Sequence, residues 1–108
     1  MRLTIIVSDG AVYKNGSSYS ELDLSFMPSD VRAFQWYETY GEIEYKRQIV
    51  DGKSVHPENE LVTSLPNWVN QCLVKWDEAE ASRLAAEEQA RLAAEEAARL
   101  ANASPQQT

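Results

Sequence analysis

The sequence has few of the residues on which catalytic and metal sites depend. It contains one cysteine, Cys72, and one histidine, His56. A single cysteine cannot form an intrachain disulfide, and one imidazole with one thiol cannot supply the several ligands of a transition-metal site. Neither a glycine-rich phosphate-binding loop nor a nucleophile motif is present. The sequence therefore predicts no catalytic, metal-binding or cofactor-binding residues, and favours a protein that acts by binding or assembly.

Long apolar runs and an excess of positive charge are also missing. No run is long enough to span a membrane, and Leu3–Val7 is too short for the apolar core of a signal peptide. The net charge is −7, with ten acids against seven bases in residues 1–76 and seven against three in residues 77–108. This balance disfavours binding to nucleic acid or to an anionic membrane. We therefore expect a protein partner and a cytoplasmic location.

Glycine and proline, four of each in the chain, are absent between Pro66 and Pro105. This gap allows one helix from Ser64 to Ala101, about 37 residues and roughly 55 Å long. Ser64 is a suitable N-cap, because its hydroxyl can accept a hydrogen bond from a free N–H of the first turn. Pro66 suits the first turn, where its missing donor costs nothing.

The predicted helix has two parts of different character. In the first part, apolar residues at helical spacing form one stripe that must be buried against the preceding chain. These residues are Leu65, Trp68, Val69, Cys72, Leu73 and Trp76. Cys72 is therefore expected to be a buried thiol. The second part repeats Ala, Glu, Arg and Leu, and Glu87 and Glu95 each precede an arginine by four positions. Such ion pairs add about 0.2–0.5 kcal/mol each.

A heptad of small residues runs along the second part. Counting alternately four and three places Ala79, Ala86, Ala90, Ala93, Ala97 and Leu100 on one seam. Arg83 interrupts this seam, and the repeated leucines wind away from one another. Small seam residues permit close packing of two helices, which would make the chain a homo-oligomer or pair it with a helix of its partner. A solvated, ion-paired spacer fits the same residues, and both interpretations stay open.

The first 63 residues predict a β-rich head. Leu3–Val7 is typical of a strand, and Ala11–Lys14 and Ser17–Tyr19 flank Asn15-Gly16, a strong hairpin signal. Leu22–Phe26 alternates and predicts a short extended piece. Further expected features are a hairpin over Ile49–Val55 and a polar loop over His56–Glu60.

The most distinctive hairpin of the head joins Phe34–Glu38 to Glu42–Lys46. Aromatic residues here and in the first turns of the helix are expected to form the core, together with Ile43. They are Phe34, Trp36, Tyr37, Tyr45, Trp68 and Trp76. The alternative is an aromatic platform for carbohydrate or peptide. Glu42 and Glu44 share a strand face and are expected to point to water, without an acid–base role.

The expected fold class is α+β, with small antiparallel hairpins packed on the start of one long C-terminal helix. The expected divisions are a β-rich head (1–63), a docked helical portion (64–80), an extended helix (81–101) and a flexible tail (102–108).

A family resemblance rests on Ala33–Tyr37, Gly41–Tyr45, Ser64–Trp68 and Trp76–Ala79, with the Asn15-Gly16 hairpin before them. Over about residues 1–80 the chain resembles small proteins of tailed bacteriophages that are encoded beside tail-fibre genes and described as tail-fibre assembly or tail-associated proteins. The resemblance implies a non-enzymatic role in tail-fibre assembly or in the tail, in the host cytoplasm during infection or in the virion. The alternative is a small cytoplasmic phage effector that inhibits a host enzyme or defence complex.

Overall fold

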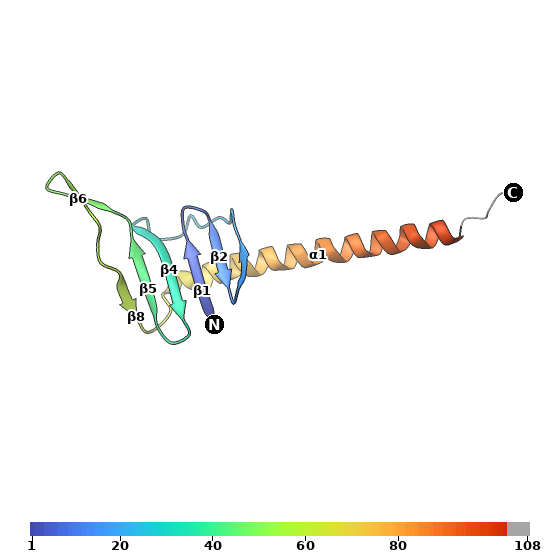
Figure 1. Ribbon diagram of the computed structural model, residues 1–108, viewed down its shortest axis with the longest axis horizontal. Helices are drawn as coiled ribbons and strands as arrows, with labels where there is room; N and C mark the ends of the chain where they lie inside the picture. The colour runs from blue at the N-terminus through green and yellow to red at the C-terminus, as the bar shows by residue number, and fades with distance from the viewer. Residues whose placement is uncertain (104–108) are drawn as a thin grey trace. The chain divides into compact units, whose positions relative to one another are not determined.

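The computed structural model describes residues 1–103 and has the predicted α+β class. An antiparallel sheet of six strands has the order β3-β2-β1-β4-β5-β8, and β6 and β7 form a separate two-stranded sheet. Figure 1 shows the first turns of the helix α1 behind the larger sheet. The strands are β1 (Arg2–Ile6), β2 (Ala11–Lys14), β3 (Ser17–Tyr19), β4 (Val31–Tyr37), β5 (Gly41–Tyr45), β6 (Gln48–Val50), β7 (Lys53–Val55) and β8 (Glu60–Val62).

The first four strands form a Greek key. Hairpins connect β1 to β2 and β2 to β3, and the connection over residues 20–30 then brings β4 back beside β1. This is the 3-2-1-4 arrangement of that motif. The turn between β2 and β3 has positive φ at both central residues, 49° at Asn15 and 87° at Gly16. Both signs are those of a type I′ turn, as the Asn-Gly pair predicts.

Two predictions about the extended segments are wrong. Leu22–Phe26 forms no strand: it belongs to the connection between β3 and β4, where the N–H of Ser25 donates to Oδ1 of Asp23 at 3.1 Å. Hydrogen bonds from the Ser25 side chain and then from its backbone N–H lower the pKa of the Asp23 carboxyl. The alternation in sequence instead reflects a loop that inserts Leu24 into the core.

The loop over His56–Glu60 is shorter than predicted, because Glu60 already begins β8. Glu60 pairs with Ile43 and Val62 with Gly41, so β8 continues the sheet beyond β5. β8 has only three residues, too few for a clear alternation in the sequence. It is recognised as a strand by its backbone pairing with β5.

The core lies between the sheet and the first turns of α1. Its buried residues are Leu3, Ile5, Val12, Leu24, Met27, Val31, Phe34, Trp36, Ile43, Val69 and Cys72. Tyr45, Trp68 and Trp76 pack against this cluster and are partly buried. The Phe34 and Trp68 rings meet in a T-shaped arrangement at a centroid distance of 5.1 Å, which fastens the helix to β4.

The helix α1 spans Asn67–Ala103 and is 37 residues long. It begins at Asn67, three residues after the expected N-cap Ser64. The carbonyl of Pro66, just before the helix, accepts a hydrogen bond from the N–H of Val69 at 3.0 Å. The helix ends two residues later than expected, so that 102 and 103 of the predicted tail are helical. Residues 104–108 of that tail lie outside the described residues. The chain divides into two compact units between Asp77 and Glu78.

Candidate functional site

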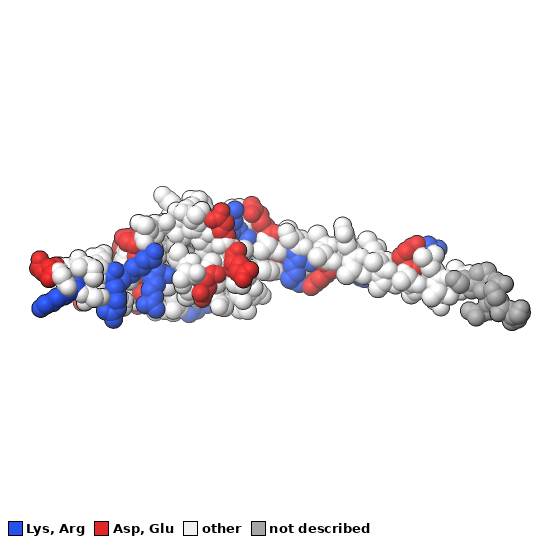
Figure 2. Space-filling model, turned by 90° about the horizontal axis from the view of Figure 1, so that it is seen from above, with Lys and Arg blue, Asp and Glu red and all other residues white. Residues whose placement is uncertain are grey.

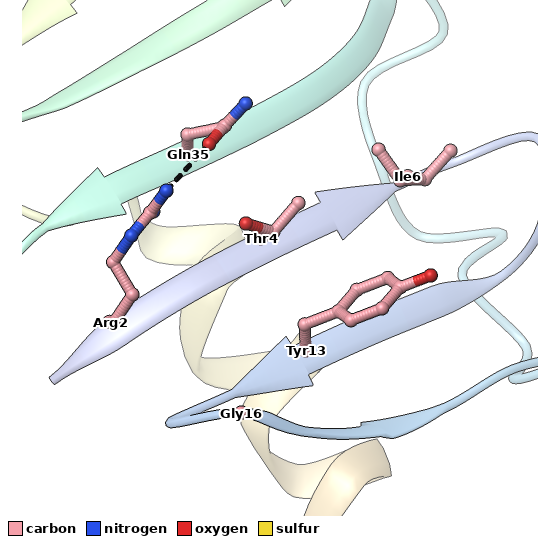
Figure 3. A pocket seen from close by; sticks show the side chains of 6 residues that line it. All are labelled: Arg2, Thr4, Ile6, Tyr13, Gly16 and Gln35. Atoms are coloured by element: carbon pink, nitrogen blue, oxygen red, sulfur yellow. Dashed lines mark hydrogen bonds between the residues drawn. The ribbon is translucent and has the colours of Figure 1, made fainter.

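One face of the six-stranded sheet packs on α1, and the other forms an open face. On β1, Leu3 and Ile5 are fully buried on the helix side, while Arg2, Thr4 and Ile6 alternate with them on the open face. Side chains from β2 and β4 complete a shallow hollow of about 520 Å³, with α1 behind the sheet (Figure 3). The hollow is lined by Arg2, Thr4, Ile6, Tyr13, Gly16 and Gln35.

Arg2 is held at the edge of this hollow by a set of hydrogen bonds. Its Nη1 donates to the carbonyl oxygens of Leu3 at 3.2 Å and Trp36 at 2.9 Å, and its Nη2 donates to Oε1 of Gln35 at 2.9 Å. Its guanidinium carbon lies 4.3 Å from the centroid of the Tyr37 ring. A guanidinium has five N–H groups, so donors remain for a partner's carboxylate or carbonyl. The side chain is therefore a positioned cation.

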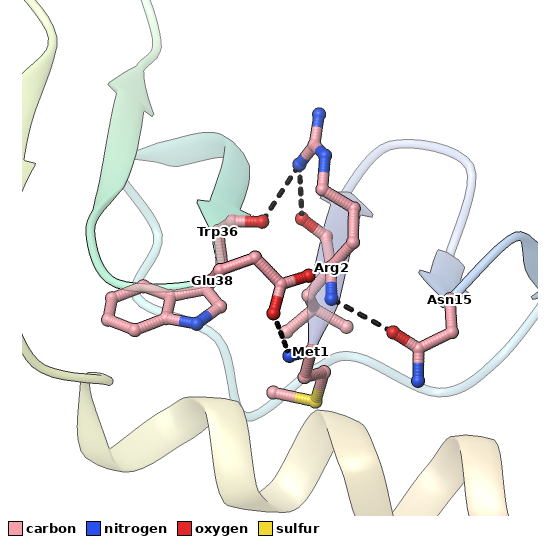
Figure 4. Close-up of polar contacts among 6 residues, drawn as sticks. Met1, Arg2, Asn15, Trp36 and Glu38 are labelled. Atoms are coloured by element: carbon pink, nitrogen blue, oxygen red, sulfur yellow. Dashed lines mark hydrogen bonds and ion pairs between the residues drawn. The ribbon is translucent and has the colours of Figure 1, made fainter.

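The backbone around Arg2 is fixed as well (Figure 4). The Arg2 N–H donates to Oδ1 of Asn15 at 2.9 Å, and the amino group of Met1 lies 2.6 Å from Oε2 of Glu38. These contacts join the start of β1 to the β2–β3 turn and to the turn after β4. The edge of the hollow is thus held on both sides.

Aromatic and apolar side chains extend the open face beyond the hollow. The Tyr13 side chain is 43% exposed, and the rings of Tyr37 and Tyr40 lie 5.1 Å apart between centroids. On β8, Leu61 is 68% exposed and sits opposite Glu42 in the register. Tyrosine and arginine are the residue types that dominate binding energy in protein interfaces. The open face therefore has the composition of a protein-binding surface.

The six aromatic residues of the core-or-platform hypothesis do not lie together on one exposed surface. Phe34 and Trp36 are buried in the core between the sheet and α1, and Trp68 packs on Phe34. The Nε1 of Trp76 donates to the Ser17 carbonyl at 3.1 Å, which ties α1 to β3. Tyr37 lies on the open face beneath Arg2. An aromatic platform built from all six is therefore wrong.

Tyr45 makes a polar contact beside the core. Its hydroxyl donates to Oε1 of Glu60 on β8. That bond, with burial, raises the pKa of Tyr45 to about 12. The contact links β5 to β8 through side chains as well as backbone, and it leaves Tyr45 engaged within the fold.

Four of the six seam residues of α1 are exposed alanines. Ala86, Ala90, Ala93 and Ala97 are exposed and Leu100 is half exposed, while Ala79 is partly buried. The expected ion pairs are arranged differently from the prediction. Each of Arg83 and Arg91 contacts a glutamate three positions before it and another four positions after it, so that Glu87 pairs with Arg83 and Glu95 with Arg91. Each of these two arginines thereby reaches two carboxylates, and the hydrogen bonds that Arg91 donates to Glu88 and Glu95 raise its pKa.

The candidate reactive groups are occupied by structural contacts. Cys72 is fully buried, its Sγ lies 3.5 Å from Sδ of Met27, and burial raises its pKa to about 12. Glu44 lies 3.2 Å from Nη1 of Arg32 and 3.9 Å from Nε2 of His56. Within residues 1–103, no group of three or more His, Cys, Asp or Glu side chains is placed to hold a metal ion. No helix in this part of the chain is long and apolar enough to cross a membrane.

The residues of the hollow were missed by the sequence analysis. The signal for them is weak but present, because Arg2 and Thr4 alternate with Leu3 and Ile5 along one strand. Comparison of the chain with protein-family models, with curated proteins and with solved structures gave no match.

Proposed function

We propose that the chain is a non-enzymatic phage protein that binds another tail protein through the open face of its sheet, either during tail-fibre assembly or as a small component of the tail. Its proposed location is the host cytoplasm during infection or the virion tail. The observation that carries the proposal is the hollow beside Arg2, where a fixed cation and an exposed tyrosine lie together. The phage context rests on the resemblance of residues 1–80 to tail-fibre-associated proteins.

The chemistry of the open face favours a protein ligand. Arg2 is bound to two backbone carbonyls and one amide, so it is ordered before any partner arrives and little side-chain entropy is lost on binding. The hollow is shallow and bordered by Tyr13, Ile6 and Gln35, which suits a side chain of a protein surface. Such a pocket beside a cation fits a partner residue with a carbonyl or carboxylate.

Co-expression with the fibre protein of the same phage tests this proposal. The full chain should co-purify with the fibre protein and increase the fraction that is soluble. Thr4→Lys fills the hollow and Tyr13→Ala removes its exposed ring. Each variant should keep the fold and bind the fibre protein at least about tenfold more weakly, which is a loss of roughly 1.4 kcal/mol of binding free energy. Leu92→Ala, at a site on α1 that is 50% exposed, is the control and should bind as the wild type does.

Two results would count against the proposal. If the chain recovers no tail protein from infected cells and is captured instead on a host enzyme or defence complex, it is an effector. If the fibre protein binds Thr4→Lys as tightly as the wild type, the hollow is not the binding site.

We further propose that α1 associates with another helix through the seam, either in a second copy of the chain or in a tail protein. The support is the exposure of the small seam residues and the arrangement of arginine–glutamate pairs beside them. Ala90→Glu with Ala93→Glu places charges on the seam and keeps good helix formers. In sedimentation the wild type should be oligomeric and the double variant monomeric. A wild-type monomer, with no partner helix recovered, would make this part of α1 a spacer.

A further inference from the structure

The hairpin over Gln48–Val55, here called the arm, stands apart from the six-stranded sheet. Its strands β6 and β7 pair only with each other, in the register Gln48↔Val55, Ile49↔Ser54 and Val50↔Lys53. The turn has positive φ at Asp51 and Gly52, 51° and 75°. Figure 1 shows the arm beyond the end of β5, with its turn away from the sheet.

The arm carries three aliphatic side chains that remain exposed to solvent in the described chain. Ile49 is 73% exposed, Val50 is 50% exposed and Val55 is 43% exposed. The register places Val50 and Val55 on one face of the hairpin and Ile49 on the other, so each face carries exposed apolar surface. An isolated two-stranded hairpin is marginally stable in water. A partner that covers these residues would stabilise it.

Positive charge is concentrated around these aliphatic residues. Lys46, Arg47 and Lys53 fall within eight positions that contain one acid, Asp51, although the whole chain has a net charge of −7. All three cations are exposed, and within residues 1–103 no ion pair joins any of them to a carboxylate. In Figure 2 the Lys and Arg side chains gather at the end of the head that carries the arm. The local potential is therefore opposite in sign to that of the chain.

We propose that the arm is a second docking surface, which binds an extended segment of a partner protein in which acidic residues alternate with apolar ones. Each strand of a two-stranded sheet has one edge of unpaired N–H and C=O groups, and an extended segment can add to that edge. Apolar side chains of the added strand would cover the arm's valines, and its carboxylates would meet the lysines and the arginine.

The charges and residue types of the arm favour this partner over other classes. A second copy of the chain, docked arm against arm, would bring its own Lys46, Arg47 and Lys53 against the first three cations. Single-stranded nucleic acid is bound by aromatic stacking surfaces, and the arm has aliphatic residues instead. An anionic membrane attracts the same cations but is repelled by the acidic remainder of the chain. The proposal does not depend on which protein the open face binds.

The test uses the full chain and two synthetic ten-residue peptides, one alternating glutamate with valine and the other alternating lysine with valine. Titration of each peptide into isotopically labelled protein should show at least about tenfold tighter binding of the acidic peptide. The amide signals that shift should be those of residues 46–55. Equal affinity for the two peptides, or shifts confined to other residues, would overturn the proposal without any mutation.

Variants of the arm separate the contribution of its apolar side chains from that of the nearby positive charges. Ile49→Ser with Val55→Ser should abolish binding of the acidic peptide, and Lys46→Glu with Arg47→Glu and Lys53→Glu should reverse the preference toward the lysine peptide. Val74→Ser and Arg99→Glu, on exposed sites of α1, are the matched controls for the apolar and charge changes and should bind as the wild type does. Because the arm contributes nothing to the core, all variants should keep the wild-type melting temperature.

The last variant replaces Gln48–Val55 by a glycine–serine linker. The β5–β8 pairing does not include these residues, so the sheet should persist while peptide binding is lost. Peptide binding that survives the replacement would place the site elsewhere. Binding of the wild type to vesicles of phosphatidylglycerol, with no binding to the acidic peptide, would identify a membrane-binding hairpin and refute the protein-docking proposal.

Discussion

Along α1, the turns from Asn67 to Asp77 and those from Glu78 to Ala103 carry different side chains. The first part buries Val69 and Cys72 completely and packs three further apolar residues against the core. In the second part every residue from 81 to 103 is exposed, and the polar contacts are ion pairs between residues three or four apart. The same helix therefore belongs to two units that are stabilised by different interactions.

The difference shows that continuity of a helix does not imply shared stability. Burial of apolar surface contributes about 25 cal/mol per Å² and depends on residues distant in sequence. An exposed ion pair on a helix contributes about 0.2–0.5 kcal/mol and depends only on its own turn. A given substitution should therefore be severe where the α1 side chain is buried in the core and mild where it is exposed.

The largest contrast is expected for one substitution made twice on α1. Val69→Asp places an unpaired carboxylate where the side chain is fully buried, and should destabilise the fold by more than about 3 kcal/mol. Val74→Asp makes the same change at a site that is 52% exposed, and should stay within about 0.5 kcal/mol of the wild type. Urea unfolding followed by tryptophan fluorescence measures both. Similar losses for the two variants would contradict the burial pattern.

A smaller loss is expected from Trp68→Ala. The Trp68 ring makes a T-shaped contact with Phe34 but is only partly buried. The cost should therefore be about 3 kcal/mol, at the lower limit for removal of a core aromatic residue. Leu92→Ala, on the exposed part of α1, should change the unfolding free energy of the first unit by less than about 0.5 kcal/mol. An unchanged melting temperature for Trp68→Ala would mean that the helix is not fastened to β4 at this position.

The features that the sequence predicts well depend on local signals. The Asn15-Gly16 turn, the β4–β5 hairpin and the apolar stripe from Trp68 onward each follow from turn chemistry or from side-chain period within a few residues. The length of α1 follows from the gap between Pro66 and Pro105. The fold class was therefore available from the sequence.

For strands that are distant in the chain, the sequence does not predict which lie beside one another in the sheet, because no local signal marks those neighbours. The contact of Arg2 with the Trp36 carbonyl joins positions 34 apart, and no local pattern marks it. The β4–β5 hairpin and the arm give similar hairpin signals, yet the first is central to the sheet and the second is bare. Only the tertiary packing distinguishes them, because exposure depends on what the rest of the chain places beside a hairpin.

A polar contact in the first unit should affect the Tyr45 titration, whereas one on the exposed part of α1 should not. The pKa of Tyr45 is raised from 10.0 to about 12 by its bond to Glu60, so the protonated phenol is favoured in the folded state. The resulting stability is present below pH 10 and is lost as the pH rises from 10 to about 12. Glu60→Gln should return the Tyr45 pKa toward 10, seen as earlier phenolate absorbance in an alkaline titration. Glu88→Gln, which removes a contact to Arg91, should leave the tyrosine titration unchanged.

The smallest effect is expected from deleting residues 81–108. All of the deleted residues that the structure describes are exposed, and the buried stripe of α1 ends before them, so no core contact is lost. The three tryptophans, Trp36, Trp68 and Trp76, lie in the first unit, and their fluorescence therefore reports on that unit alone. In urea, the truncated and full-length chains should unfold within about 0.5 kcal/mol of each other, while the helical circular-dichroism signal falls sharply. Both should be measured at a concentration where sedimentation shows monomers, since association through the seam would stabilise the longer chain by mass action. A truncated chain that unfolds earlier or aggregates under these conditions would show that the two parts of α1 share their stability.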